Sequence, residues 1–449
     1  MQQDIRKSID EGAMVRFQWL AVAICVMLVM LDGFDVLVMA FTASSISAEW
    51  HLSGAQLGVL FSAGLVGMAA GSLLLAPQAD RYGRQAIILV CLALITVGML
   101  LSALAQSSLQ LGLLRALTGV GIGGMLASVG VITAEYSSQK WRSTCVAFQA
   151  TGYPIGATLG GMVAAVLLTH YGWRSVFVFG GLTTLAMVPV VLWLLPESVD
   201  FLLAKQPQGA LGKLNTLLRK MQRPVLQSLP ARSVPVAGAA PVGGFKSLFS
   251  PAILRSTLLI WSAFFLLMFS FYFALSWTPK LLVAAGLSAQ QGITGGVLLN
   301  LGGIVGGTLF GVLASRLDLG RLTAACLAIT AVAMAVFGYV TGALDLAFMA
   351  AFGIGMFIFG GMAGLYSFAP IIYPAAVRTT GMGWAIGIGR MGAILAPLTA
   401  GVLLDSGWAP PQLYYVFAIP LLLAVVAVLA IRAKAPVAAR ASGTLSAAH

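Results

Sequence analysis

About twelve apolar segments, each near the ~20 residues that an α-helix needs to cross hydrocarbon, follow one another along this chain of 449 residues. Because 59% of the residues are hydrophobic and only 8% are charged, the chain cannot be a soluble domain. The sequence therefore predicts an all-α membrane protein with twelve transmembrane helices. The expected spans are 17–43, 55–77, 86–106, 109–134, 143–168, 174–195, 254–279, 289–314, 322–342, 345–369, 381–404 and 411–431.

A polar, proline-containing segment separates the first six spans from the last six. We expect an N-terminal six-helix half at 1–195, a cytoplasmic linker at 196–252, a C-terminal six-helix half at 253–431 and a cytoplasmic tail at 432–449. Within the linker, an amphipathic helix is expected near 203–221.

The two halves repeat each other in sequence. The loop after span 2, Asp80-Arg81-Tyr82-Gly83-Arg84, recurs after span 8 as Asp318-Leu319-Gly320-Arg321. Tyr136 and Arg142 before span 5 recur as Tyr373 and Arg378 before span 11. Two parallel six-helix halves around a site at the middle of the membrane are a layout typical of transporters.

The positive charges predict the orientation of the helices. When the spans alternate from a cytoplasmic N-terminus, all but four of the 25 Lys and Arg residues fall on the cytoplasmic side, and both termini are then cytoplasmic. The exceptions are Arg115, Arg174, Lys280 and Arg390. The net charge of +12 therefore indicates contact with lipid headgroups and no nucleic-acid partner.

Cysteine and histidine are too few and too scattered for metal or redox chemistry. The four cysteines lie within expected spans, and His51, His170 and His449 lie in outer loops and the tail. We expect no metal, no cofactor, no disulfide and no enzymatic activity.

Two aspartates near the middle of the first span are the main functional indication. Asp32 and Asp35 share one helix face, and a carboxylate at membrane depth is usually retained for a charge or proton pathway. Counting along the helices places Asp35 at a depth similar to that of Arg115 in span 4. Because burial favours the neutral acid and a cation favours the carboxylate, moving Arg115 away would make Asp35 take up a proton. The alternative is a static ion pair that only fixes span 1 against span 4.

Arg390 lies well inside span 11, and no carboxylate occupies the interior of spans 7 to 12. A planar guanidinium binds a carboxylate through two parallel hydrogen bonds, so the carboxylate of a substrate is a natural partner. Alternatively, Arg390 pairs with main-chain carbonyls or with Asp32 or Asp35 across the cavity.

Several of these motifs resemble those of the major facilitator superfamily and, within it, the aromatic acid:proton symporter family. The resemblance covers nearly the whole chain and rests on the motifs Asp32-Gly33-Phe34-Asp35, Asp80-x-x-Gly83-Arg84, Arg115-x-x-x-Gly119-x-Gly121, Glu135, Pro196-Glu197-Ser198, Arg378 and Arg390. It implies alternating access of two six-helix halves, in a monomer of the bacterial inner membrane that supplies aromatic catabolism. Ala76 and Gln85 depart from the usual loop motif, which begins with Gly and ends with a basic residue.

The resemblance also implies roles at the cytoplasmic surface. One loop is expected to clamp span 2 to span 11 while the carrier is open to the outside. Its residues are Asp80, Arg81, Gly83 and Arg84. Alternatively, the charges of this loop only reflect the excess of positive residues on the cytoplasmic side. The remaining gating candidates are Arg378, Asp318 and Arg321. Glu135, at the end of span 4, is expected to accept protons or to gate; alternatively, it is an interfacial glutamate paired with local cations.

An aromatic acid also requires a slot for its ring. Spans 7 and 10 are rich in Phe, and the tyrosines with polar neighbours, Tyr272 and Tyr366, are the candidates for ring contacts. The candidates for binding a ring hydroxyl are Asn300, Gln149 and Tyr153; each could instead hydrogen-bond between helices.

The prediction is therefore proton-coupled uptake of a small aromatic carboxylate. An exporter of drugs or metabolites with the same fold is the leading alternative, and a membrane sensor is a third possibility. The stretch from Gly152 to Gly161 in span 5 only partly matches an antiporter signature, so we interpret it as a site of helix bending and close packing.

Overall fold

The computed structural model describes residues 2–230, 245–251, 253–340, 343–374 and 377–431. Twelve of the described helices are long and apolar enough to cross a membrane, which confirms the predicted fold class. They are α2 (Arg16–Trp50), α3 (Gly54–Leu74), α5 (Arg84–Ser102), α6 (Ser108–Tyr136), α7 (Arg142–Tyr171), α8 (Trp173–Leu194), α11 (Leu254–Ala284), α12 (Ala289–Ala314), α13 (Leu319–Val340), α14 (Leu344–Ile372), α15 (Arg378–Asp405) and α16 (Pro410–Ala430).

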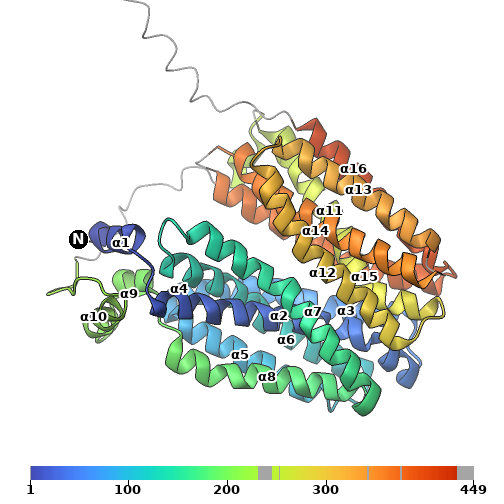
Figure 1. The fold of residues 1–449 in the computed structure, drawn as a ribbon, viewed down its shortest axis with the longest axis horizontal. Helices are drawn as coiled ribbons and strands as arrows, with labels where there is room; N and C mark the ends of the chain where they lie inside the picture. Colours follow the sequence, from blue (N-terminus) through green and yellow to red (C-terminus); the bar gives the residue numbers. More distant parts are fainter. Residues whose placement is uncertain (1, 231–244, 252, 341–342, 375–376, 432–449) are drawn as a thin grey trace, which may run out of the picture.

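The helices form two bundles, α2 to α8 and α11 to α16, which are inclined to each other (Figure 1). Glycine allows helices within a bundle to pack backbone to backbone. A Cβ atom on Gly33 of α2 would overlap the main-chain oxygen of Tyr153 on α7, and one on Gly156 would overlap that of Met30. The glycine-rich stretch of α7 is therefore a packing surface against α2.

Short helices collect at one end of the first bundle, which we call the linker end. They are α1 (Gln2–Glu11), α4 (Ala79–Tyr82), α9 (Val199–Lys205) and α10 (Ala210–Lys220), with the 3-10 turn η1 (Ala76–Gln78). A second 3-10 turn, η2 (Phe245–Phe249), packs against α11 and α15 of the second bundle. The single amphipathic helix expected near 203–221 is instead two helices. The chain turns between them, with positive φ at Gln206 (47°) and Gly209 (76°), and Pro207 cannot donate a helical hydrogen bond.

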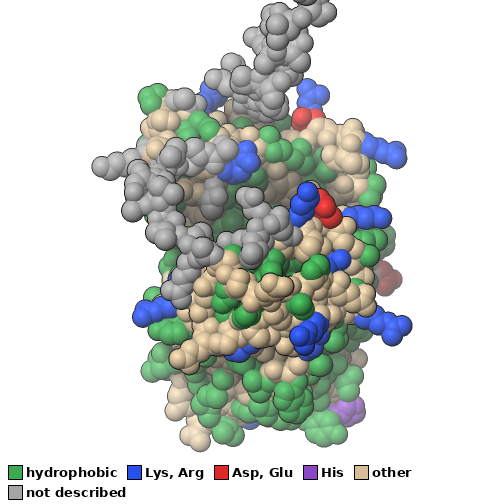
Figure 2. Space-filling model, turned by 90° about the vertical axis from the view of Figure 1, so that its left-hand side faces the viewer, with side chains coloured by type: hydrophobic (Ala, Val, Ile, Leu, Met, Phe, Trp, Pro, Cys, Tyr) green, Lys and Arg blue, Asp and Glu red, His purple; other side chains and the backbone are tan. Residues whose placement is uncertain are grey.

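The N-terminal helix α1 lies across the linker end and was not predicted. Its Ile5 and Ile9 side chains are buried, and Asp10 forms an ion pair with Arg142 at the start of α7. The main-chain oxygen of Asp10 also accepts the N–H of Gln139 at 2.9 Å. Figure 2 views this end of the molecule, where Lys and Arg side chains are prominent. The central part of the linker (231–244) and the expected tail (432–449) lie outside the described residues.

The two bundles meet along a seam between α3 and α15 that is tight at the end opposite the linker end. A Cβ on Gly54 would lie 2.6 Å from the main-chain oxygen of Gly401, and one on Gly58 would lie 2.5 Å from that of Pro397. Further along, the Ser62 hydroxyl donates to the Ile394 main-chain oxygen at 2.7 Å.

Toward the linker end the seam opens. Gly387 and Gly383 continue the helix face of α15 that carries Ile394, seven and eleven residues earlier. Among the described residues, no atom would lie within 4 Å of a Cβ on either glycine, and both glycines are exposed. The bundles are therefore closed on each other at one membrane surface and separated at the other.

Candidate functional site

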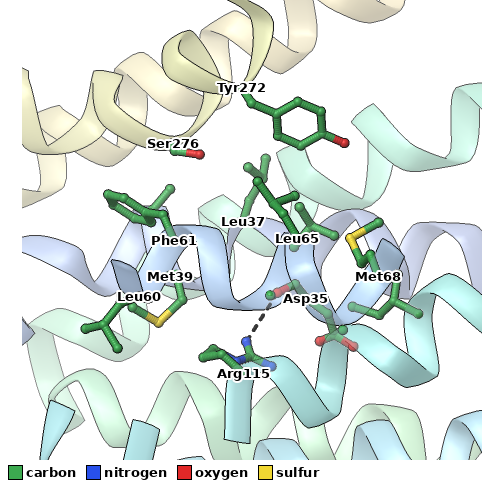
Figure 3. A pocket seen from close by; sticks show the side chains of 15 residues that line it. Asp35, Leu37, Met39, Leu60, Phe61, Leu65, Met68, Arg115, Tyr272 and Ser276 are labelled. Atoms are coloured by element: carbon green, nitrogen blue, oxygen red, sulfur yellow. Dashed lines mark hydrogen bonds between the residues drawn. The ribbon is translucent and has the colours of Figure 1, made fainter. Parts of the chain in front are cut away.

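Arg115 reaches α2 at the level of Asp35, as the depth count predicted, but it contacts the main chain. Its Nη1 donates to the Asp35 carbonyl oxygen at 3.4 Å (Figure 3). Its Nη2 lies 3.2 Å from the Met99 sulfur. The guanidinium also lies over the Phe177 ring, 5.4 Å from its centre. The predicted pairing of two charged side chains is thus replaced by a cation held between a carbonyl, a thioether and an aromatic ring.

The carboxylates of Asp32 and Asp35 are almost fully buried, at 0% and 2% exposure. Within the described part of the chain, none of their four oxygens has a hydrogen-bond partner. The Asp35 carboxylate faces α8, where a Cβ on Gly180 would come within 3.2 Å of its Oδ1. A charged carboxylate without a donor is costly in such a place, whereas a neutral acid costs much less.

A cavity of about 30 Å³ adjoins Asp35 and reaches the second bundle. Asp35 and Arg115 line it from the first bundle, and Tyr272 and Ser276 line it from α11 (Figure 3). It has room for about two water molecules and is far smaller than the ~300 Å³ of typical ligand pockets. The cavity can therefore hold water between Asp35 and the second bundle, but it is too small for an aromatic acid.

Arg390 lies among three of the tyrosines named from the sequence. Its Nη1 donates to the Tyr272 hydroxyl at 3.4 Å, and Tyr366 and Tyr153 are within electrostatic range of its guanidinium. Tyr153 is also within electrostatic range of Asp32. Among the described residues, Arg390 has no carboxylate partner within 4.0 Å. The arrangement leaves the cation of Arg390 available to an anionic ligand.

Three buried polar groups on α7 and α12 have no partner in the described ranges. They are the Tyr153 hydroxyl, the Gln149 Oε1 and the Asn300 Oδ1. The Asn300 amide nitrogen donates to the Gly296 carbonyl at 2.9 Å, so only its oxygen is unsatisfied. Unsatisfied buried acceptors are costly, and a ligand hydroxyl could satisfy them.

Glu135 is buried in a network at the linker end. It pairs with Arg84, and the Ser198 hydroxyl donates to its Oε2 at 2.6 Å. Arg84 Nη1 also contacts the Ser198 oxygen at 2.5 Å, and Arg6 of α1 reaches the Glu135 carbonyl at 3.3 Å. Glu135 is therefore tied to the gating loop rather than freely exposed to water.

The gating-loop residues have partners within the first bundle. Asp80 contacts Arg84 at 3.4 Å, and Arg81 lies over the Tyr82 ring. Gly83 has a φ of 104°, which favours glycine. The Glu197 carboxylate then caps α5, accepting the N–H of Arg84 at 2.8 Å.

Gln85, which replaces the last basic residue of the loop motif, donates to the carbonyls of Val191 and Leu195, each at 3.0 Å. The corresponding loop of the second half is simpler. Asp318 itself caps the start of α13, with its Oδ1 accepting the Arg321 N–H at 2.8 Å. Arg378 is exposed at the first position of α15.

Two residues near the aspartates were missed from the sequence. Ser276 lies one helical turn after Tyr272 and lines the same cavity. Its spacing of four residues from Tyr272 could have indicated this from the sequence, because such residues share one helix face. Gly180 could not be found, because only the fold shows that a Cβ there would overlap the Met99 methyl group and crowd the Phe34 ring, with Oδ1 of Asp35 at 3.2 Å. No cluster of potential metal ligands occurs among the described residues.

The twelve-helix fold and the buried charges at mid-membrane define a membrane transporter, not an enzyme. The chain belongs to the Major Facilitator Superfamily, whose family model matches residues 22–385.

Two curated relatives are similar over almost their whole length. A gallate transporter of Pseudomonas putida is 34% identical over 433 residues, covering 95% of this chain and 94% of the relative. The 4-hydroxybenzoate transporter PcaK of Pseudomonas aeruginosa is 31% identical over 435 residues, covering 95% of each chain. Among solved structures, the partially occluded inward-open conformation of the xylose transporter XylE from E. coli matches with a TM-score of 0.71. That match has 15% identity and covers 92% of this chain and 97% of XylE.

Proposed function

We propose that this protein imports a small aromatic carboxylate together with protons. The observation that carries the proposal is Arg390, a mid-membrane cation with tyrosine hydroxyls as neighbours and no carboxylate partner in the described residues. The names of the relatives, which are transporters of gallate and of 4-hydroxybenzoate, support an aromatic acid as the substrate.

In this proposal, Arg390 binds the substrate carboxylate, and Tyr272 and Tyr366 contact the ring. Tyr153, Gln149 and Asn300 offer unsatisfied polar groups to ring hydroxyls. Discrimination by such groups is strong, because a ligand that lacks the hydroxyl leaves a buried polar atom unpaired.

Asp32 and Asp35 carry the protons, and Arg115 and Glu135 assist their uptake and release. Movement of the two bundles would change whether Arg115 contacts the carbonyl or the carboxylate of Asp35, and so would change the affinity of Asp35 for a proton. Asp80, Arg81, Gly83, Arg84, Arg378, Asp318 and Arg321 are the proposed gating residues.

We place the protein as a monomer in the inner membrane of a bacterial cell. The linker end and both termini would lie in the cytoplasm. The halves 1–195 and 253–431 would rock about the central site, joined by the linker 196–252. Since the seam between α3 and α15 opens toward the linker end, the structure then corresponds to an inward-facing state.

Purified protein in proteoliposomes tests the proposal. Labelled gallate, 4-hydroxybenzoate, benzoate and an aliphatic carboxylate would be supplied outside, with and without an inward proton gradient. We expect accumulation of at least one aromatic acid only when the gradient is present. A third arm imposes an outward proton gradient. Accumulation that requires this outward proton gradient would instead support the exporter, and no flux of any acid would support the sensor.

A further inference from the structure

Asp405 is the last residue of α15, and its carboxylate crosses from the second helix bundle to the first. Its Oδ1 accepts the Gly54 N–H at 2.6 Å, and its Oδ2 accepts the Ala55 N–H at 2.8 Å. These are the first two residues of α3, whose N–H groups have no partner within their own helix. A helix N-terminus also carries partial positive charge, which attracts a carboxylate. One half of the protein therefore caps a helix of the other half.

The remaining donors at this helix start are satisfied locally. Ser53 accepts the Gln56 N–H at 3.2 Å, and the Gln56 side chain accepts the Ser53 N–H at 3.0 Å. Gly54 and Ala55 are only half-buried and Asp405 is exposed, so water can replace the carboxylate if the bundles separate. The contact can therefore break and re-form without leaving a buried donor unpaired.

The position of this contact couples it to the opening of the seam between the bundles. It lies at the extreme end of the α3–α15 seam, beyond the close approaches of Gly54 to Gly401 and of Gly58 to Pro397. An alternating-access carrier must open this end of the seam to admit substrate from that side. The two hydrogen bonds of Asp405 must break in that step.

We propose that Asp405 is a gating residue that holds the seam closed while the carrier is open at the linker end. It acts on the same helix pair as the proposed clamp at Asp80 and Arg84, but at the opposite membrane surface. Each surface then has a carboxylate that stabilises its own closed state, and the balance between them sets the ratio of inward-facing to outward-facing carriers. The inference depends on transport by two rocking halves and not on the identity of the substrate.

The test measures access to the cavity from outside intact cells, without any substrate. A Ser276→Cys reporter places a thiol in the cavity beside Asp35, and the four native cysteines are buried. A membrane-impermeant maleimide is added outside, and the labelling rate is compared with and without Asp405→Asn. In the Asn variant the side-chain NH₂ group would face one of the two backbone N–H donors and could not accept its hydrogen bond. Because losing one hydrogen bond to a charged group weakens the closed state, we expect the labelling rate to increase about tenfold. Asp405→Glu should restore much of the parental rate.

Glu49→Gln is the matched control, because Glu49 is another exposed carboxylate at the same surface. Its partners, Trp173 at 2.6 Å and Arg174 at 2.9 Å, belong to its own bundle, so its loss should leave labelling unchanged. A cysteine at the exposed Lys213 on α10 checks sidedness, since it should react in inverted vesicles and not in intact cells. Parental labelling in Asp405→Asn, or equal acceleration in Glu49→Gln, would overturn the proposal. Gel filtration of each variant verifies folding.

Discussion

The guanidinium of Arg115 donates to the main-chain carbonyl of Asp35 at 3.4 Å, while the Asp35 carboxylate faces α8 without a hydrogen-bond donor in the described residues. The cation and the acid are therefore adjacent but not paired through their side chains. This arrangement leaves the acid available for a proton in one state and for the cation in another.

Replacing Asp35 by Asn should uncouple transport from protons, because an amide cannot bind and release them in the physiological pH range. We expect uptake driven by a pH gradient to fall at least about tenfold, the loss produced by roughly 1.4 kcal/mol of coupling free energy. Exchange of labelled for unlabelled substrate at equal pH should continue. Asp345→Asn, at an exposed acid near the start of α14, is the control. If Asp35→Asn still concentrates substrate in a pH gradient, Asp35 does not carry the coupled proton.

Replacing Arg390 by Ala should weaken binding of an aromatic acid by about tenfold or more, since a charged hydrogen bond contributes roughly 1.5–3 kcal/mol. Binding is measured by calorimetry with the free acid and with its uncharged methyl ester. The parent should prefer the acid, and Arg390→Ala should bind both alike. Tyr272→Phe, which removes only the hydroxyl that Arg390 contacts, should give a smaller loss. An unchanged preference for the acid in Arg390→Ala would exclude Arg390 from carboxylate recognition.

Arg84 and Glu135 should be energetically coupled, because their side chains are 14% and 3% exposed and form an ion pair. Arg84→Ala alone should lower the free energy of unfolding by about 3 kcal/mol, since it leaves the carboxylate buried without its cation. Combining it with Glu135→Gln should recover part of that loss. Thermal unfolding of the two single variants and the double variant in detergent measures the coupling. Strictly additive effects would show that the pair is not coupled.

Gly156→Ala should destabilise the first bundle, because the added methyl group would overlap the main-chain oxygen of Met30 on α2. Overpacking of this kind costs about 1–3 kcal/mol, and the midpoint of thermal unfolding should fall. Gly353→Ala is the matched control in another membrane helix, where a Cβ would meet no atom within 4 Å. That variant should be neutral or slightly more stable, since Ala is the better helix former. Equal melting of the two variants would show that α2 and α7 can separate at low cost.

The transmembrane spans were largely predictable, because hydrocarbon thickness imposes a length on each apolar segment. The predicted 289–314 coincides with α12, whereas the predicted 17–43 ends well before Trp50, the last residue of α2. Apolar residues indicate only the part of a helix that can lie in lipid, and α2 continues beyond that part through the more polar residues 44–50. The short helix α1 was missed because its stability depends on distant contacts such as that of Asp10 with Arg142.

The residue types of the candidate site were predictable, but their contacts were not. Arg390 and Tyr272 stand out as polar residues in apolar helices, and the structure brings them within hydrogen-bond distance. The direction of the Asp35 carboxylate could not be predicted, because it depends on how α2 packs against α8, a helix far along the chain. Asp405 was missed for a related reason, since a carboxylate at a helix end is unremarkable until its partner on another helix is known.

The docking of α1 against the first bundle has a practical consequence for handling the protein. Ile9 is fully buried and Asp10 bonds to Arg142 and Gln139, so the first residues of the chain are part of the folded body. An affinity tag or fluorescent fusion placed directly before Gln2 would crowd this surface and lower the yield of folded protein.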